Sequence, residues 1–237
     1  MTGMTAADPD TAETAAAILQ LLAGSTAEPL PRHKHGLSRD DVRKSQSARI
    51  LAAAIDLFAD QGYADTTVLQ IAKRAGVSRK TFYEFYDCKE DVFLGTYKAV
   101  RVLVTEAGLA GDGALALESL PQYIERLLLV LGVAPAATRM FFLEALGAGP
   151  RVRARRNEAI TEFVTAVAPR LRQLRERVEP TLPPLSTELC YAVTAAAMEL
   201  VVGHLTRSTP ETLSQLAPEL TRVVTAIVTP NHPARAP

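Results

Sequence analysis

The stretch VSRKTFYEFYDCKE, residues 77–90, combines cations, hydroxyl groups and aromatic rings in one short segment. If the segment is helical, one face turns inward and carries Phe82, Phe85 and Tyr86. The other face, near the helix N-terminus, then carries Arg79, Lys80 and Tyr83. Cations, a phenol and the free N–H groups of a helix start suit a polyanion, and the major groove of DNA admits a helix of this width. The segment therefore predicts a helix that binds duplex DNA.

Two helices are expected to precede this segment and hold it in place. Apolar residues spaced i, i+3, i+4, i+7 predict a first helix over residues 45–61, ended by Gly62. Thr67 and Gln70 form a capping box, and a second stripe predicts a helix of about eight residues that ends at Gly76. The link GVS is long enough only for a tight turn, so the three elements predict a helix-turn-helix.

A further helix is expected to follow the aromatic segment. Asp87 and Glu90, three residues apart, form a second capping-box pattern at its start. Lys89 lies in the first turn, where free N–H groups and the positive end of the helix dipole favour a phosphate. Lys89 is therefore a candidate phosphate ligand.

The sequence from residue 48 to residue 97, ARILAAAIDLFADQGYADTTVLQIAKRAGVSRKTFYEFYDCKEDVFLGTY, resembles the DNA-binding domain of the TetR family of transcriptional regulators. The shared motifs are the first-helix pattern, the turn G-Y-x-x-T-T-V-x-x-I-A, the recognition turn A-G-V-S-x-x-T-x-Y and the K-E start of the next helix. The resemblance implies an all-helical protein whose variable second domain binds a small molecule and dimerises. It also implies release from the operator when the ligand binds.

The resemblance assigns DNA contacts residue by residue. It implies that Thr66 and Thr67 lie at the phosphate backbone and that Tyr83 and Lys89 bind phosphates. Four residues are implied at base edges and phosphates of the major groove: Ser78, Arg79, Lys80 and Thr81. Lys80 stands where the family often has a small residue, so the base preference there is open. Purely structural roles are the alternative for three of these residues: Ser78 and Thr67 as helix caps and Tyr83 as a packing residue.

Basic residues also precede the first helix. They are Arg32, Lys34, Arg39, Arg43 and Lys44. We expect part of this arm to lie along DNA, in the minor groove as homeodomain arms do, and assign DNA contact to Arg43 and Lys44. Residues 1–40 are predicted to be a mobile tail with a possible extra helix.

Beyond the DNA-binding segment the chain shows only helical stripes. They predict helices from about Leu120, over residues 136–146, 151–178 and 187–205, and after Pro210, where Pro218 must kink or shorten the last one. The predicted fold is all-α with about nine helices. A three-helix DNA-binding domain at 41–92 precedes a larger helical effector-binding and dimerisation domain at 93–230, with a tail at 231–237.

The last two predicted helices carry little charge. Between Tyr191 and His204 only Glu199 is ionised. Such a surface favours burial on more than one side, and the resemblance implies a four-helix interface with a second subunit. We therefore expect a homodimer, with its two recognition helices about 34 Å apart or somewhat more.

The second domain is expected to bind a small, largely hydrophobic effector whose identity the sequence does not give. A few polar groups among apolar walls would orient such a ligand. Arg101 and Glu144 can instead pair with each other, and each aromatic residue can be core. The candidate lining residues are Tyr97, Arg101, Tyr123, Met140, Phe141, Glu144, Phe163, Tyr191 and Met198.

Several other classes of protein are disfavoured. The sequence has no G-x-G-x-x-G, G-K-[ST], H-E-x-x-H or G-x-S-x-G motif, so neither an enzyme nor a cofactor or metal site is expected. Cys88 and Cys190 are far apart, which indicates a reducing cytoplasm, and no apolar run reaches the ~20 residues of a membrane span. Two alternatives remain: a redox-responsive regulator acting through Cys88, and a DNA-binding protein without an effector.

Overall fold

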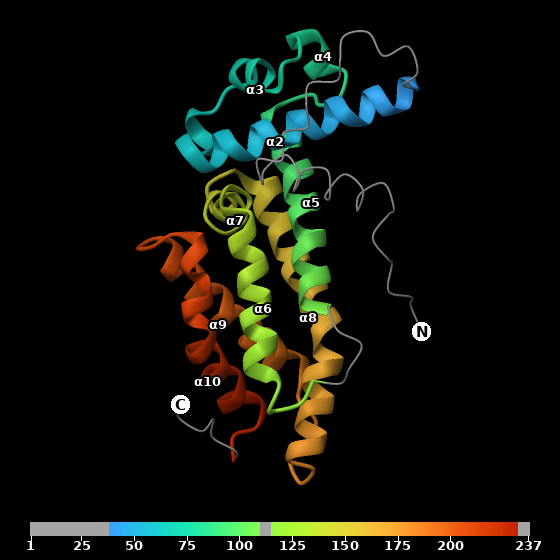
Figure 1. Cartoon of the computed structure of the whole chain (residues 1–237). Coiled ribbons are helices and arrows are strands. Elements are labelled where there is room, and N and C mark those ends of the chain that lie inside the picture. Colours follow the sequence, from blue (N-terminus) through green and yellow to red (C-terminus); the bar gives the residue numbers. More distant parts are fainter. Residues whose placement is uncertain (1–37, 110–114, 232–237) are drawn as a thin grey trace. The chain divides into compact units, whose positions relative to one another are not determined.

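The computed structural model describes residues 38–109 and 115–231, where helices joined by turns and loops are present without a strand. The possible extra helix in the N-terminal tail lies outside them. The all-α prediction is confirmed (Figure 1). The α-helices are α2 (Arg39–Asp65), α3 (Val68–Ala75), α4 (Arg79–Tyr83), α5 (Lys89–Leu109), α6 (Leu120–Val133), α7 (Pro135–Phe142), α8 (Pro150–Val178), α9 (Thr187–Leu205) and α10 (Ala217–Val228). Two 3₁₀ helices, η1 (Glu144–Leu146) and η2 (Pro210–Leu216), complete the elements.

Helix α2 begins six residues before the predicted start at Ser45. Ser38 caps it, because its hydroxyl accepts from the N–H of Asp41 at 3.0 Å and the Asp41 carboxylate accepts from the N–H of Ser38 at 3.1 Å. The Ser38 hydroxyl also donates to the Asp41 carboxylate at 2.8 Å, and this bond is the largest cause that lowers the pKa of Asp41. At the other end Gly62 adopts φ +84°, so the regular helix breaks where the sequence predicts.

Helix α5 begins at Lys89, two residues after the predicted cap at Asp87. Its first turn is closed by Cys88, whose thiol donates to the Asp91 carboxylate at 3.2 Å. That hydrogen bond is the largest cause of the lowered pKa of Asp91, and Arg151 adds to it. Cys88 and Asp91 thus occupy the positions that the sequence assigned to Asp87 and Glu90.

The described residues divide into two compact units, and the domain limits at 41–92 and 93–230 stay a prediction. Among the described residues, the first unit holds 38–103 and 136–153 and joins the DNA-binding segment to most of α5, to α7 and to the start of α8. The second holds 104–109, 115–135 and 154–231 and contains α6, most of α8, α9 and α10.

The first unit has an aromatic core that runs along α5. Phe93 packs against Phe58 and Tyr63, with ring centroids 5.1 and 5.4 Å apart. One turn further, Tyr97 stacks on Phe141 of α7 at 4.3 Å and an interplanar angle of 13°. These contacts tie α2, α5 and α7 together by aromatic packing.

The second unit packs α6 against η2 and α10, and α10 against α9 (Figure 1). A buried arginine, Arg175 of α8, holds the end of α10. Its guanidinium donates to the carbonyls of Val228 at 2.9 Å and Ile227 at 2.6 Å, which are among the last carbonyls of that helix. Glu179, also buried, accepts from the backbone N–H of Asn231 at 2.8 Å.

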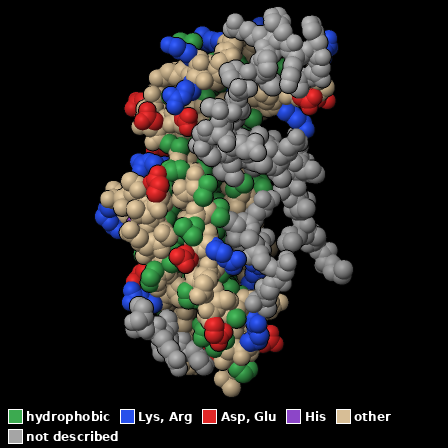
Figure 2. Space-filling model, viewed as in Figure 1, with side chains coloured by type: hydrophobic (Ala, Val, Ile, Leu, Met, Phe, Trp, Pro, Cys, Tyr) green, Lys and Arg blue, Asp and Glu red, His purple; other side chains and the backbone are tan. Residues whose placement is uncertain are grey.

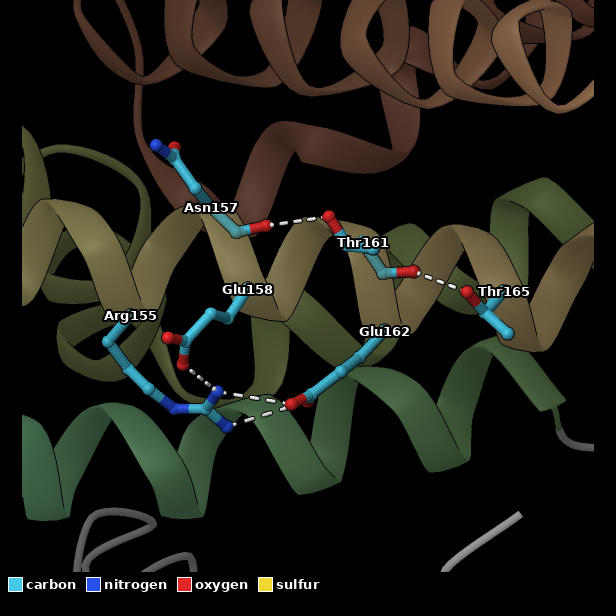
Figure 3. Close-up of polar contacts among 6 residues, drawn as sticks. All are labelled: Arg155, Asn157, Glu158, Thr161, Glu162 and Thr165. Carbon is cyan, nitrogen blue, oxygen red and sulfur yellow. Dashed lines mark hydrogen bonds and ion pairs between the residues drawn. The ribbon is translucent and has the colours of Figure 1, made fainter. Parts of the chain in front are cut away.

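The solvent side of α8 is polar in the second unit. Arg155 lies between two carboxylates and donates to Glu158 at 2.9 Å and to Glu162 at 3.1 Å (Figure 3). On the same helix the hydroxyl of Thr161 donates to the carbonyl of Asn157 at 3.1 Å, four residues back. These local bonds pair polar side chains along the exposed face of a long helix.

Helix α9 has the predicted bounds and is unusually apolar. Among the described helices, only α9 is by itself long and apolar enough to span a membrane. Of the 18-residue segment with this composition, 28% is buried. A core or interface helix of a water-soluble protein has the same composition. His204 at its end is half-buried and its Nε2 lies 2.8 Å from the hydroxyl of Thr212, so this histidine has a structural partner.

Two predicted helices are shorter than expected. The helix predicted over residues 136–146 ends at Phe142 and continues as the 3₁₀ turn η1. The last predicted helix begins as η2, and the regular helix α10 starts only at Ala217 with Pro218 in its first turn. The expectation that Pro218 shortens this helix is confirmed, since proline is favoured in the first turn of a helix.

Candidate nucleic-acid interface

Helix α3 begins and ends as the sequence predicts. Thr67 caps it, with its hydroxyl accepting from the N–H of Gln70 at 3.3 Å and its own N–H donating to the Gln70 side chain at 2.8 Å. At the other end Gly76 takes the left-handed conformation, φ 64° and ψ 36°. A side chain with a Cβ would be strained at this φ, so glycine is required for the tight turn into α4.

Helix α4 exposes the predicted polar residues at its start. Ser78 caps it by accepting from the N–H of Thr81 at 2.9 Å. Arg79 and Lys80 follow as exposed side chains, and the Arg79 guanidinium lies 5.7 Å from the centre of the Tyr83 ring. Lys and Arg side chains are visible over the end of the first unit that carries α3 and α4 (Figure 2). Cations and free N–H groups thus share one surface.

The inward face of α4 is smaller than predicted. Of the three residues predicted to face inward, only Phe82 is fully buried. Tyr83, predicted on the outer face, is 44% exposed. Phe85 and Tyr86 follow the end of the five-residue helix and are half-buried. The Tyr86 hydroxyl lies 3.3 Å from the Ser47 hydroxyl, and burial raises the pKa of Tyr86.

Two residues assigned to phosphate contact are engaged within the protein. Thr66 is 1% exposed, and its hydroxyl donates to the carbonyl of Gly62 at 2.7 Å. The Lys89 ammonium donates to the carbonyls of Tyr63 at 2.6 Å and Ala64 at 3.2 Å, and lies 4.3 Å from the centre of the Tyr63 ring. Burial lowers the pKa of Lys89. Both side chains therefore shape the end of α2, and Thr67 is the exposed member of the threonine pair.

The described residues of the basic arm, Arg39, Arg43 and Lys44, are exposed, and Arg32 and Lys34 lie outside the described residues. The Arg43 guanidinium stacks over the Phe85 ring at 4.6 Å and donates to the carbonyl of Glu84 at 3.5 Å, just after α4. Lys44 is also exposed. Arg43 therefore braces the end of α4 while its charge stays at the surface.

The residues assigned to effector binding fall in both compact units. In the first unit Tyr97 and Met140 are fully buried and Phe141 stacks on Tyr97, while Arg101 is half-buried. Glu144 accepts a hydrogen bond from the backbone N–H of Tyr63 at 2.8 Å. The members in the second unit are Tyr123, Phe163 and Met198, which are half-buried, and Tyr191, which is 43% exposed on α9.

The sequence reasoning missed two bracing residues. The bond of Glu144 to Tyr63 joins residues 81 positions apart, and no local pattern marks it. The hydrogen bond of Cys88 to Asp91 at the start of α5 was also missed, because thiols are weak donors. A signal for the second was present, since Asp91 lies three residues after Cys88 at capping-box spacing.

Known proteins match both the interface and the rest of the chain. Residues 50–96 match the family model described as bacterial regulatory proteins, tetR family. The transcriptional regulator EthR of Mycolicibacterium smegmatis is 31% identical over 173 residues, which cover 69% of this chain and 75% of EthR. The chain belongs to the TetR family. The regulator HbdR of an Aromatoleum species is 44% identical over 52 residues, but these cover only 22% of this chain and 23% of HbdR.

Solved structures show the TetR-family fold over most of the chain. FadR of Bacillus subtilis, in complex with stearoyl-CoA, matches with a TM-score of 0.63 at 22% identity. The match covers 78% of this chain and 98% of the FadR chain. GusR of Salmonella enterica also has a TM-score of 0.63, at 16% identity, over 81% of this chain and 98% of its own. At these identities the likeness is one of fold.

Proposed function

We propose that this TetR-family regulator is a repressor that binds a palindromic operator as a homodimer and is released by a small, largely hydrophobic effector. The observation that carries the DNA-binding part is the exposed set Arg79, Lys80 and Tyr83 at the capped start of α4. A recognition helix reads base edges with its first residues while the preceding helix lies at the backbone. The protein is then expected to act in the cytoplasm, where its operator lies.

Each group of the proposed interface has a distinct task. Arg79 and Lys80 reach base edges or phosphates, Tyr83 and Thr67 donate hydroxyl hydrogen bonds to phosphates, and Ser78 and Thr81 lie at the mouth of the groove. Arg43 and Lys44 add charge beside α4. Lys89 and Thr66 act indirectly, by fixing the end of α2 that leads into α3.

The outer face of α9 supports the homodimer. Ala192, Ala195 and Glu199 form an exposed line along this helix, and Leu189 is 40% exposed at its start. Small side chains allow a second helix to approach closely, and the apolar area favours burial. We place α9 and α10 of two copies against each other, which would set two α4 helices on successive major grooves.

Replacing Ala195 by Arg is expected to convert the dimer into a monomer at micromolar concentration and to weaken operator binding at least tenfold, because a large charge cannot be buried in a close helix contact. Sedimentation velocity gives the oligomeric state. Ala154→Arg, on the exposed face of α8, is the matched control and should remain dimeric. An Ala195→Arg protein that stays dimeric would contradict the α9 interface.

The effector is proposed to be largely apolar. A helical region of this size exceeds what dimerisation needs, and one structural neighbour of the same fold binds stearoyl-CoA. Acyl-CoA thioesters of graded chain length are therefore the first compounds to test.

The function is tested by titrating the purified protein into duplexes tiled across the DNA upstream of its own gene, with fluorescence anisotropy as readout. One duplex with twofold-symmetric half-sites should bind at nanomolar concentration in excess competitor DNA, and an effector should release it. Equal binding to every duplex would refute the regulator proposal, and specific binding that no compound releases would leave a regulator without an effector.

A further inference from the structure

We propose that Glu144 is a positioning residue for operator binding, acting through the backbone N–H of Tyr63. The inference rests on the proposed DNA-binding function and adds to it a residue outside the helix-turn-helix. Its basis is a set of contacts within the first compact unit.

The carboxylate of Glu144 lies at the point where α2 breaks. Gly62 has φ +84° and ψ 163°, which interrupts the regular helix just before Tyr63. The Tyr63 N–H donates to Oε2 of Glu144 at 2.8 Å, and a Cβ on Gly62 would lie 3.4 Å from the same oxygen. A carboxylate therefore supplies, from η1, an acceptor at the N–H that follows the helix break.

The carbonyl of the same residue is held from another helix. Lys89 of α5 donates to the Tyr63 carbonyl at 2.6 Å and lies over the Tyr63 ring. The ring also packs against Phe58 and Phe93, with centroids 5.5 and 5.4 Å away. Tyr63 is thus fixed by an anion at its N–H, a cation at its carbonyl and aromatic packing at its side chain.

The fixed residue leads directly into the proposed DNA-binding surface. The N–H of Thr66 donates to the Tyr63 carbonyl at 3.4 Å, and the Thr66 hydroxyl donates to the Gly62 carbonyl. Thr67, the next residue, is the cap of α3. The direction in which the chain leaves Tyr63 therefore sets the position of α3, and through the tight turn at Gly76 that of α4.

A second polar contact in the same region offers a matched control. Arg151, at the start of α8, donates to Glu90 at 3.0 Å and to Asp91 at 2.9 Å. This ion pair joins the chain after η1 to the start of α5 and forms no hydrogen bond with the backbone of residues 62–67, although its charges act on the Tyr63 phenol. Its arginine is 57% exposed, and ion pairs open to solvent contribute little.

The test compares operator affinity of Glu144→Ala, Glu144→Gln and Arg151→Ala by anisotropy. Glu144→Ala should bind about tenfold more weakly, since a hydrogen bond to a charged group that fixes the bound conformation is lost. Glu144→Gln keeps an oxygen acceptor and should stay within about threefold of the parent protein. Arg151→Ala should stay within about twofold.

The outcomes separate this inference from the proposed function. A parent protein that binds no operator refutes DNA binding itself. A parent protein that binds, with Glu144→Ala equal to it or Glu144→Gln as weak as Glu144→Ala, refutes the role of Glu144. If Glu144→Ala does not fold, as judged by circular dichroism, exchange of the Tyr63 amide proton in the parent protein decides: slow exchange supports the bond, and exchange at the rate of an open amide refutes it.

Discussion

Replacing Arg79 and Lys80 together by Ala is expected to weaken operator binding about 100-fold or more. Both side chains are exposed at the capped start of α4, so neither contributes to the core. A good base contact is worth about 1–3 kcal/mol, and each phosphate contact adds a counterion-release contribution. The slope of log affinity against log salt should also fall by up to about 2. Anisotropy titrations between about 50 and 200 mM salt measure both effects.

The control for this pair is Lys73→Ala. Lys73 is exposed on α3 and is not among the residues assigned to DNA contact, so its loss should change affinity less than threefold. Circular dichroism of all variants should match the parent protein. If the Arg79 and Lys80 double variant binds the operator as tightly as the parent protein, α4 does not read the DNA.

Replacing Arg175 by Ala is expected to lower the free energy of unfolding by about 3 kcal/mol. The side chain is 6% exposed and donates to the carbonyls of Val228, Ile227 and Pro183. Its removal leaves these buried acceptors without their donor, and each costs about 1 kcal/mol or more. For a chain of this size the melting temperature should fall by roughly 6–12 °C.

Arg222→Ala provides the comparison for Arg175. Arg222 pairs with Glu219 on the exposed face of α10, three residues away. Exposed pairs of this kind contribute less than about 1 kcal/mol, so the melting temperature should change by no more than about 4 °C. Equal melting temperatures for Arg175→Ala and the parent protein would show that the end of α10 does not need this clamp.

The features that sequence predicted well are those with local causes. The capping box of Thr67 and Gln70, the left-handed Gly76 and the break at Gly62 each depend on residues a few positions apart. Helix α9 has the predicted bounds, since Ser186 provides a cap immediately before an uninterrupted apolar run. Local chemistry decides such elements, so a single sequence suffices.

The features that sequence missed depend on distant partners. Lys89 and Thr66 have residue types that suit phosphates, and no local pattern shows that carbonyls near the end of α2 accept hydrogen bonds from both; their phosphate contacts stay a prediction. Glu144 fits an effector pocket by composition, yet its partner is a backbone N–H 81 residues earlier. Arg175 is similar, since two of its acceptors, Ile227 and Val228, lie more than 50 residues away on α10. Charge and spacing alone cannot distinguish a buried clamp from a binding residue.

The central claim, that the start of α4 enters the major groove, is tested most directly by methylation interference on the operator. Dimethyl sulfate modifies guanine N7 in the major groove and adenine N3 in the minor groove, so one reaction reports both grooves. We expect guanine N7 methylation to block binding in two clusters whose centres are about 10 bp apart or somewhat more. Both subunits of the Arg79 and Lys80 double variant lack these side chains, so methylation should lose its effect at both clusters. Binding that is blocked only by adenine N3 methylation, or by no guanine at all, would contradict it.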